Sequence, residues 1–260
     1  MTLRPKDSPA AIWLVWKRYF AIFRKSWLYG LMVTIVEPML ILFAFGVGMH
    51  AMIGDMSVDG VALSYRQFVL AGVAGQAVLL QGFFEGAYGS FIRMYYQRIF
   101  QAIAVTPITL SEVLWAELIW DATRASFSAA MVLLIGVILG DFDPLGALAS
   151  VPLVCIGGLL FGSMGVFCAG RSRTIEELNY PQYLVAIPMF LFCGVFFPVS
   201  TLPEWFQPVV YALPLTALVE AVRGLTLEVP FPAWALPSLF LWTIVTVPAA
   251  RRQMTKRLVS

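Results

Sequence analysis

The sequence contains little charge and few of the side chains that carry catalysis. Of its 260 residues, 12% are charged, whereas a soluble domain averages about 25%. It has a single histidine, His50, and its cysteines, Cys155, Cys168 and Cys193, all lie in apolar runs. The cysteine spacings fit neither a metal site nor a redox pair. We therefore expect no metal site, no histidine proton relay and no disulfide framework.

Several short motifs of nucleotide and hydrolytic chemistry are also missing. No GxxxxGK[ST] phosphate loop occurs, so ATP binding of that kind is not expected in this chain. The motifs HExxH, GxSxG and CxxC are absent, which argues against a hydrolytic enzyme. We expect no cofactor in this chain and no nucleic-acid partner. Any work that the chain performs must draw on an ion gradient or on a partner.

Long apolar stretches dominate what is present. The composition is 60% hydrophobic and the mean hydropathy is +0.83, so the lipid bilayer is the solvent of this chain. A span needs about 20 mainly apolar residues. We predict an all-α integral membrane protein that forms one transmembrane domain. Its six spans are expected at residues 28–49, 68–92, 111–139, 148–169, 180–198 and 233–250.

Lys and Arg residues are distributed unevenly between the two sides of these spans. Fourteen of the 17 fall on the side of the termini: six before the first span, two after the second, two after the fourth and four in the tail. The opposite loops are acidic and hold Arg66 and Arg223. Because cytoplasmic loops carry the excess of Lys and Arg, both termini are predicted to be cytoplasmic.

The segment before the first span, residues 8–26, has an amphipathic pattern. Lys17, Arg18 and Arg24 share one helix face, and Trp16 lies with other apolar residues on the opposite face. A helix of this kind lies in the membrane interface, so these four residues are the expected interfacial anchor. The alternative is a cytosolic extension of the first span.

Two carboxylates fall inside predicted spans. Glu37 precedes Pro38 in the first span, and Glu85 lies in GFFEGAYGS near the end of the second. A charge inside the membrane is a functional hypothesis by default, and Glu37 is expected to line a substrate path. Structural roles remain open, because Glu37 can satisfy backbone groups freed by Pro38 and Glu85 can face water or a neighbouring helix. Without a basic partner nearby, the two would make a poor proton relay.

Glycines recur at the spacing that lets helices approach closely. Gly82 and Gly86 form one small-xxx-small pair, and Gly158 and Gly162 form another. We expect both pairs to pack helices within one subunit, although contacts in a dimer are an alternative.

The stretch between the second and third spans predicts a short helix at 93–106 that stops before Pro107. A short cytoplasmic helix of mixed polarity can insert into a groove of a soluble partner. Downstream, Glu117, Asp121 and Arg124 share one face of the next helix, which is either a functional charged face or a solvated helix end. The residues expected to contact the partner are Met94, Arg98, Phe100, Gln101 and Ile103.

Residues 201–224 follow the fifth span and are expected on the external side. Apolar residues recur there at helical spacing, while Pro208 and Pro214 interrupt the pattern and Thr216 can cap a second helix. We predict two short re-entrant helices that close the outer end of a pathway. An ordinary interfacial aromatic anchor is the alternative. The aromatic residues expected along the path and gate are Tyr183, Phe196, Phe197, Trp205, Phe206 and Tyr211.

Three stretches carry a family resemblance: VEPMLILFAFGVG, then FEGAYGSFIRM with FQAIAVTPITLSEVLWAELIW, and CGVFFPVSTLPEWFQPVVYALPLTALVEAVRG. In this order they resemble the permease subunits of type-2 ABC exporters. The resemblance is greatest to the branch that exports nodulation lipo-oligosaccharides, with drug-exporting permeases as relatives.

The resemblance implies a six-span half-transporter in a bacterial inner membrane that forms a homodimer. Each copy would receive one separate ABC ATPase subunit, which would hold ATP and Mg²⁺. The helix at 93–106 would be the coupling helix inserted into that ATPase. The substrate would be an amphiphile, such as a lipo-oligosaccharide, a lipid-linked saccharide or a hydrophobic drug.

Two other classes of function remain as alternatives. One is a membrane-embedded enzyme that processes lipids, although a positioned acid–base set is not evident. The other is an ion-coupled transporter that uses Glu37 and Glu85. Activity of the purified chain without a partner would favour either one.

Overall fold

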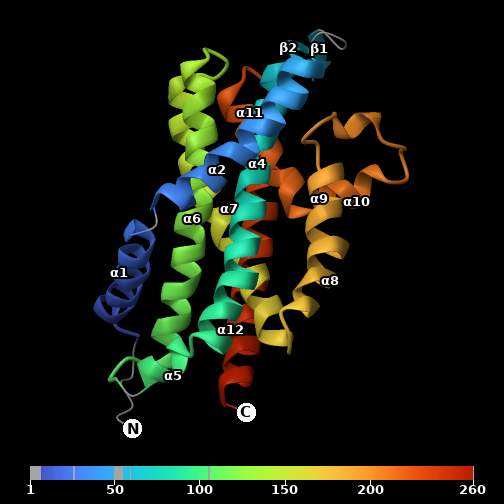
Figure 1. Ribbon diagram of the computed structural model, residues 1–260. Helices are drawn as coiled ribbons and strands as arrows, with labels where there is room; N and C mark the ends of the chain where they lie inside the picture. Colours follow the sequence, from blue (N-terminus) through green and yellow to red (C-terminus); the bar gives the residue numbers. More distant parts are fainter. Residues whose placement is uncertain (1–6, 26, 50–54, 59, 105, 260) are drawn as a thin grey trace.

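The computed structural model describes residues 7–25, 27–49, 55–58, 60–104 and 106–259. The described chain is almost entirely helical, with one small hairpin of β1 (Asp55–Val58) and β2 (Val61–Ser64), paired antiparallel with Asp55 opposite Ser64 (Figure 1). The predicted all-α class is therefore confirmed.

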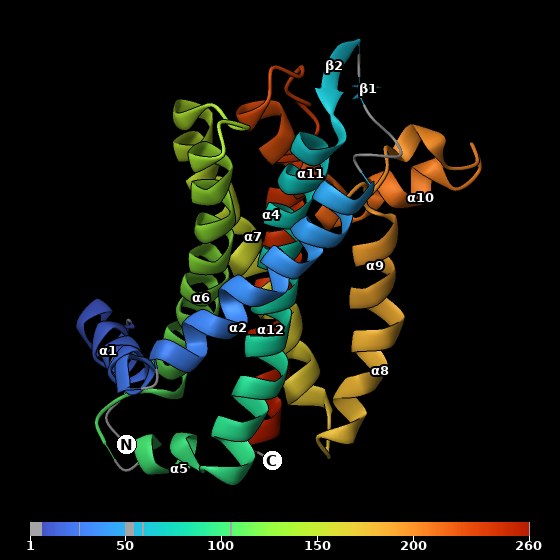
Figure 2. The ribbon, with the colours of Figure 1, turned by 45° about the horizontal axis from the view of Figure 1, so that its top comes forward.

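Three central helices are long and apolar enough to cross a membrane. Helix α4 (Tyr65–Phe84) continues through the π-helical segments η2 (Glu85–Gly89) and η3 (Ile92–Tyr96). Beside it lie α6 (Leu110–Ile138) and α7 (Pro144–Arg171) (Figure 2). These helices contain the predicted spans 68–92, 111–139 and 148–169, and extend beyond each by a few residues.

Polar caps fix where the three helices begin. Ser64 and Gln67 form a capping box at the start of α4, and Thr109 and Glu112 form another at the start of α6. At α7, the Asp143 carboxylate accepts a hydrogen bond from the Gly146 backbone N–H. Each cap pairs backbone N–H groups that the first helical turn leaves without partners.

Glycines bring α4 and α7 into backbone contact, as their spacing predicted. A methyl group on Gly86 would collide with the Gly162 carbonyl oxygen, and one on Gly82 would lie 3.3 Å from the Gly162 nitrogen. Similarly, a methyl group on Gly158 would lie 2.9 Å from the Ala122 carbonyl of α6. The prediction of packing within one subunit is confirmed for these pairs.

Two further helices pack on this centre. Helix α12 (Ala235–Val259) lies along α7, and α11 (Pro214–Thr226) packs against α4 and α7. Thr216 does not cap α11, because its hydroxyl donates to the Val210 carbonyl and Leu213 occupies the cap position. Arg223, which the sequence placed in an external loop, is fully buried in α11 and donates to the Gly194 carbonyl.

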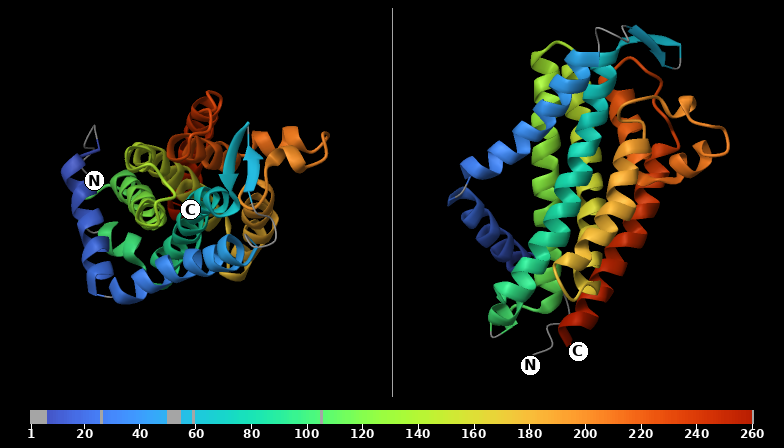
Figure 3. Two further views of the ribbon diagram at one scale, coloured as in Figure 1. Left: turned by 90° about the horizontal axis from the view of Figure 1, so that it is seen from above. Right: turned by 45° about the vertical axis from the view of Figure 1, so that its right-hand side comes forward.

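The remaining segments lie at the periphery of the centre. Helix α2 (Trp27–Ile41), continued by η1 (Leu42–Met49), crosses α4 at an angle, as Figure 3 shows. On the other side of α4, α9 (Ile187–Phe192) follows a short rising segment and ends before the predicted span end at 198. The short elements of these regions are α5 (Ile99–Ala104), η4 (Glu176–Leu178), α8 (Asn179–Pro181), η5 (Gln182–Ala186), η6 (Val199–Thr201) and α10 (Gln207–Ala212).

The N-terminal helix α1 (Pro9–Lys25) lies against α6 (Figure 1). Its predicted apolar face is covered by protein, because Val15 and Tyr19 are each only 3% exposed. Other apolar side chains of α1 remain exposed and are available to lipid: Trp13, Leu14, Phe20 and Ile22.

Candidate functional site

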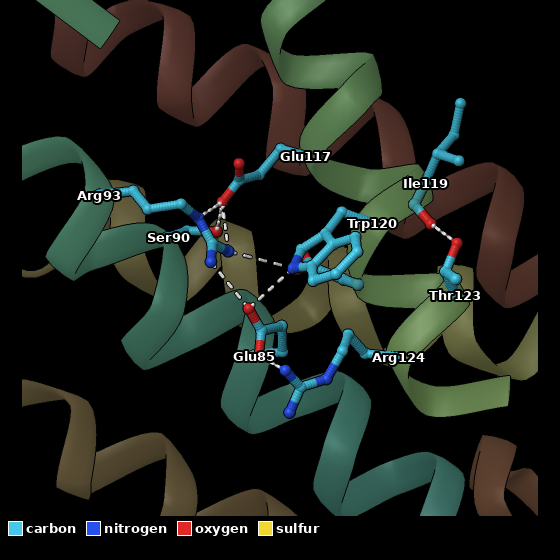
Figure 4. A network of polar contacts seen from close by, with 9 residues as sticks. Glu85, Ser90, Arg93, Glu117, Ile119, Trp120, Thr123 and Arg124 are labelled. Atoms are coloured by element: carbon cyan, nitrogen blue, oxygen red, sulfur yellow. Dashed lines mark hydrogen bonds and ion pairs between the residues drawn. The ribbon is translucent and has the colours of Figure 1, made fainter. Parts of the chain in front are cut away.

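Five charged side chains gather where α4 and its π-helical continuation pass α6. We call them the charge cluster: Glu85, Arg93, Glu117, Asp121 and Arg124 (Figure 4). Helix α6 supplies three members at positions i, i+4 and i+7, which share one helical face. The segments η2 and η3 supply Glu85 and Arg93.

Arg93 is the centre of the charge cluster. Its Nη1 lies 2.7 Å from Glu85 Oε1, and its Nη2 lies 2.6 Å from Glu117 Oε1 and 3.5 Å from Asp121 Oδ1. Its Nε also donates to Glu117 Oε1 at 2.7 Å. One guanidinium thus contacts three carboxylates, which the planar fork of arginine donors allows and a lysine could not reproduce.

Polar neighbours complete the cluster. Ser90 donates to Glu117 Oε1 at 2.6 Å, and the Trp120 indole donates to Glu85 Oε1 at 3.1 Å. Arg124 Nη1 lies 3.7 Å from Glu85 Oε2. The network therefore links α4 to α6 through several charge-assisted contacts, which are stronger than hydrogen bonds between neutral groups.

The cluster carries more carboxylates than guanidiniums. Glu117 and Asp121 are fully buried, and neither Asp121 oxygen makes a hydrogen bond within the described part of the chain. Because buried charges are costly unless they are paired and hydrogen-bonded, Asp121 is its least well compensated member.

Aromatic side chains of α1 cover the cluster. The Arg93 guanidinium lies 5.1 Å from the Tyr19 ring centre, and that of Arg124 lies 4.7 Å from the Phe23 ring centre. Burial and the neighbouring Glu117 carboxylate raise the pKa of the Tyr19 hydroxyl well above its usual range. The amphipathic helix is therefore connected to the charged core of the molecule through cation–π contacts.

Sequence reasoning missed the partners of Glu85. It assigned no basic neighbour to this carboxylate and placed Arg93 in a loop, whereas Arg93 and Arg124 both lie within 4 Å of it. It also left a solvated helix end open for Glu117 and Asp121, which are fully buried. The π-helical winding of residues 85–96 brings Arg93 back toward Glu85. Such turns are rare and frequent at functional sites.

A cavity of about 520 Å³ opens beside the cluster, between α2, α4 and α6. Its walls include the predicted path residue Glu37, two members of the charge cluster, and Gln76 of α4. Gln76 is only 2% exposed, and its amide oxygen makes no hydrogen bond within the described residues. Polar side chains that line a cavity between apolar helices are typical of a path for a polar ligand or water. The polar lining residues are Glu37, Gln76, Gln81, Glu85, Tyr88, Arg124 and Ser128.

The predicted partner-contact residues separate into an exposed and a buried group. Arg98 is exposed and adopts φ +50°, in the left-handed region, at the turn between η3 and α5. Met94, Phe100 and Ile103 are buried within the chain, at 7%, 4% and 9% exposure. The side chain of Gln101 lies outside the described residues. The surface exposed around Arg98 includes Tyr95, Tyr96 and Gln97.

The predicted gate aromatics do not form one cluster. Phe196 packs against Phe45 of η1 and Phe190 of α9, with ring centres 4.4 and 5.2 Å apart. Phe206 packs against Phe192, and Tyr211 against Trp234. The rest lie apart from the Phe196 group: Phe197 is half-buried, and Trp205 and Tyr183 are 77% and 62% exposed.

The expected interfacial anchors are also divided. The Trp16 indole donates to the Thr123 hydroxyl of α6 at 3.1 Å, so it contacts protein. Lys17, Arg18 and Arg24 are exposed. Among the described residues, no group of three or more His, Cys, Asp or Glu side chains is placed to hold a metal ion.

Comparison with known proteins gives consistent similarities. The description "ABC-2 type transporter" matches residues 10–227. Nodulation protein J of Rhizobium meliloti (strain 1021) is 32% identical over 83% of this chain and 81% of its own length. Nodulation protein J of Rhizobium leguminosarum bv. viciae is 31% identical over 91% of this chain and 90% of its own. The inner membrane transport permease YadH of Escherichia coli (strain K12) is 21% identical over 80% of each chain.

Proposed function

Because the chain belongs to the ABC-2 type transporter family, we propose that it is the permease subunit of an ATP-driven exporter. It is a multi-pass protein of the bacterial inner membrane and a transport subunit rather than an enzyme. ATP and Mg²⁺ would be held by a separate ABC ATPase, and two copies of each subunit would form the working complex. The absence of a phosphate loop from this chain supports that division.

The proposed topology has six crossings with both termini in the cytoplasm. The three long helices α4, α6 and α7 would be joined by α2 with η1, by the segment from α8 to α9, and by α12. The basic tail of α12 and the exposed Arg171 and Arg173 lie at one end of the long helices, whereas Asp141 and Asp143 lie at the other. This distribution follows the positive-inside rule.

The polar cavity between α2, α4 and α6 is the observation that carries the function. Its polar lining contains Glu37 and Gln76, yet the helices around it are largely apolar. An amphiphile suits such a site, because its head group can occupy the cavity while its apolar part stays in lipid. We propose a lipo-oligosaccharide, a lipid-linked saccharide or a hydrophobic drug as substrate, and the printed names of the relatives favour the first.

Transmission from the ATPase would pass through the turn at Arg98. The turn joins α5 to η3, and η3 carries Arg93, the centre of the charge cluster. A movement of α5 would therefore reach α6 and the cavity wall through ion pairs. At the external end, α10 and α11 would form the re-entrant lid, and the Phe45–Phe196 contact would close the path.

The test is purification of the tagged chain in a gentle detergent, followed by identification of what accompanies it and an ATPase assay. We expect a stoichiometric partner with a phosphate loop, which is lost when Arg98 and Tyr96 are changed to alanine. The matched control is Arg173→Ala, which removes an exposed charge elsewhere. A stable chain that transports without any ATPase would contradict the proposal and favour an ion-coupled mechanism, although Glu85 is already held by two arginines.

A further inference from the structure

A second cavity lies at the basic end of the molecule, far along α6 from the charge cluster. It has a volume of about 580 Å³ and lies between the first turns of α6 and the last turns of α12. Arg251, Arg252 and Lys256 line it together with Ser111 and Thr255. None of its lining residues is acidic. A pocket with this lining attracts anions.

Arg251 is fixed in place by its neighbours. Its Nη2 donates to the Ser111 hydroxyl at 2.6 Å, and its guanidinium lies 4.5 Å from the Trp115 ring centre. Asp7 lies 3.8 Å from Nη2 and compensates part of its charge. The buried Nε makes no hydrogen bond within the described residues, so one donor of this arginine remains available to a ligand.

Arg252 and Lys256 are both exposed and lie one helical turn apart on α12. Like charges at positions i and i+4 destabilise a helix. An anion bound between them would relieve this repulsion. The amino-terminal end of α6, which carries the positive end of its helix dipole, borders the same pocket.

An apolar stripe leads directly from the pocket along α12. Leu241, Ile244 and Val245 are 63%, 68% and 55% exposed. They lie on the face of α12 that continues, one turn at a time, to Pro248 and Arg252. Leu110 and Leu114 add an apolar wall to the pocket itself. An anion with acyl chains would fit both parts, with its chains along the stripe and its head group among the cations.

We propose that this pocket binds the head group of an anionic phospholipid. The bound lipid would connect the start of α6 to the end of α12 at the membrane surface. Basic pockets between transmembrane helices are known to bind anionic head groups. The site is separate from the polar cavity, so the proposal does not depend on the transported substrate.

The experiment is native mass spectrometry of the delipidated full-length chain in a neutral detergent. Phosphatidylglycerol and phosphatidylcholine with identical acyl chains are titrated separately, and inorganic phosphate is added as a competitor. We expect phosphatidylglycerol to bind at least about tenfold more tightly than phosphatidylcholine and to resist millimolar phosphate. Arg252→Gln combined with Lys256→Gln should weaken it by about 30-fold, since each juxtamembrane cation contributes about fivefold.

The controls separate this pocket from general surface charge. Arg171→Gln with Arg173→Gln removes two exposed cations from the same end and should leave the affinity unchanged. Arg252→Lys with Lys256→Arg keeps the charges and should retain binding. Lys256→Gln alone provides a milder variant if the double change prevents folding. Equal binding of the two lipids, an equal loss in both glutamine pairs, or displacement by phosphate would overturn the proposal.

Discussion

At the scale of single residues, Arg93 is the side chain on which most contacts of the charge cluster converge. It is paired with three carboxylates, and its side chain is 12% exposed. Removing one partner of a buried ion pair costs more than the pair itself contributes, because the remaining charges lose their compensation. The cluster therefore predicts effects of opposite sign for its cationic and its surplus anionic members.

Arg93→Ala is expected to destabilise the chain by about 3–5 kcal/mol. The change would leave Glu117 and Asp121 buried without a neighbouring cation. Arg93→Lys should restore only part of the loss, because a lysine cannot form the forked contact. The free energy of unfolding in detergent, measured by denaturant titration, checks this. An Arg93→Ala variant as stable as the exposed control Arg173→Ala would contradict it.

Asp121→Asn is expected to leave the stability unchanged or to raise it. The carboxylate makes no hydrogen bond in the described structure, and its ion pair with Arg93 is 3.5 Å long. Removal of its charge also brings the cluster closer to neutrality. The same titration gives the sign, with Glu117→Gln as the matched comparison. Glu117 accepts short bonds from Ser90 and Arg93, so its loss should destabilise, and an equal loss in both variants would refute the prediction.

At the scale of elements, close helix packing and a strained turn each make a separate prediction. Gly86→Ala should destabilise by about 1–3 kcal/mol, because the added methyl group would collide with the Gly162 carbonyl and force α4 away from α7. The melting temperature of the purified protein is the measurement. Gly48→Ala is the control, since the nearest atom to its methyl group is 3.8 Å away, and an equal fall in both would contradict the explanation.

Arg98→Gly separates the backbone of the turn from its side chain. Glycine adopts a positive φ without the penalty of about 1–2 kcal/mol that other residues carry, so this variant should be at least as stable as the wild type. Arg98→Ala removes the same side chain but retains the strain. If the guanidinium contacts the ATPase, both variants lose the partner in copurification. Retention of the partner by the glycine variant alone would show that the turn conformation matters instead.

Much of the helical organisation could be predicted from residue patterns, whereas the polar contacts could not. The apolar runs placed the three long helices, and the glycine spacing predicted the α4–α7 contact, because both depend on neighbours along the chain. The partners of Glu85 and the burial of Arg223 depend on distant segments. Gly194 and Arg223, which share a 2.8 Å hydrogen bond, are 29 residues apart, and no local pattern indicates such a contact.

At the scale of the whole molecule, the proposed orientation is tested by cysteine labelling. In a variant whose native cysteines are replaced, Glu204→Cys should react with a membrane-impermeant maleimide in intact cells. Arg173→Cys should react only after the cells are permeabilised. Both original side chains are exposed, so accessibility to the reagent is matched. The reverse pattern would invert the topology and place the basic end outside.

The π-helical winding of residues 85–96 also affects how the chain tolerates changes in length. Each π turn holds one more residue than an α turn, so this part of the helix can lose a residue by reverting to regular α-helical winding. Deletion of one residue there would preserve the backbone hydrogen bonds, yet it would rotate everything that follows by about 100°. The turn at Arg98 would then point in another direction, and a span that still inserts normally would present its cytoplasmic end to the wrong neighbour.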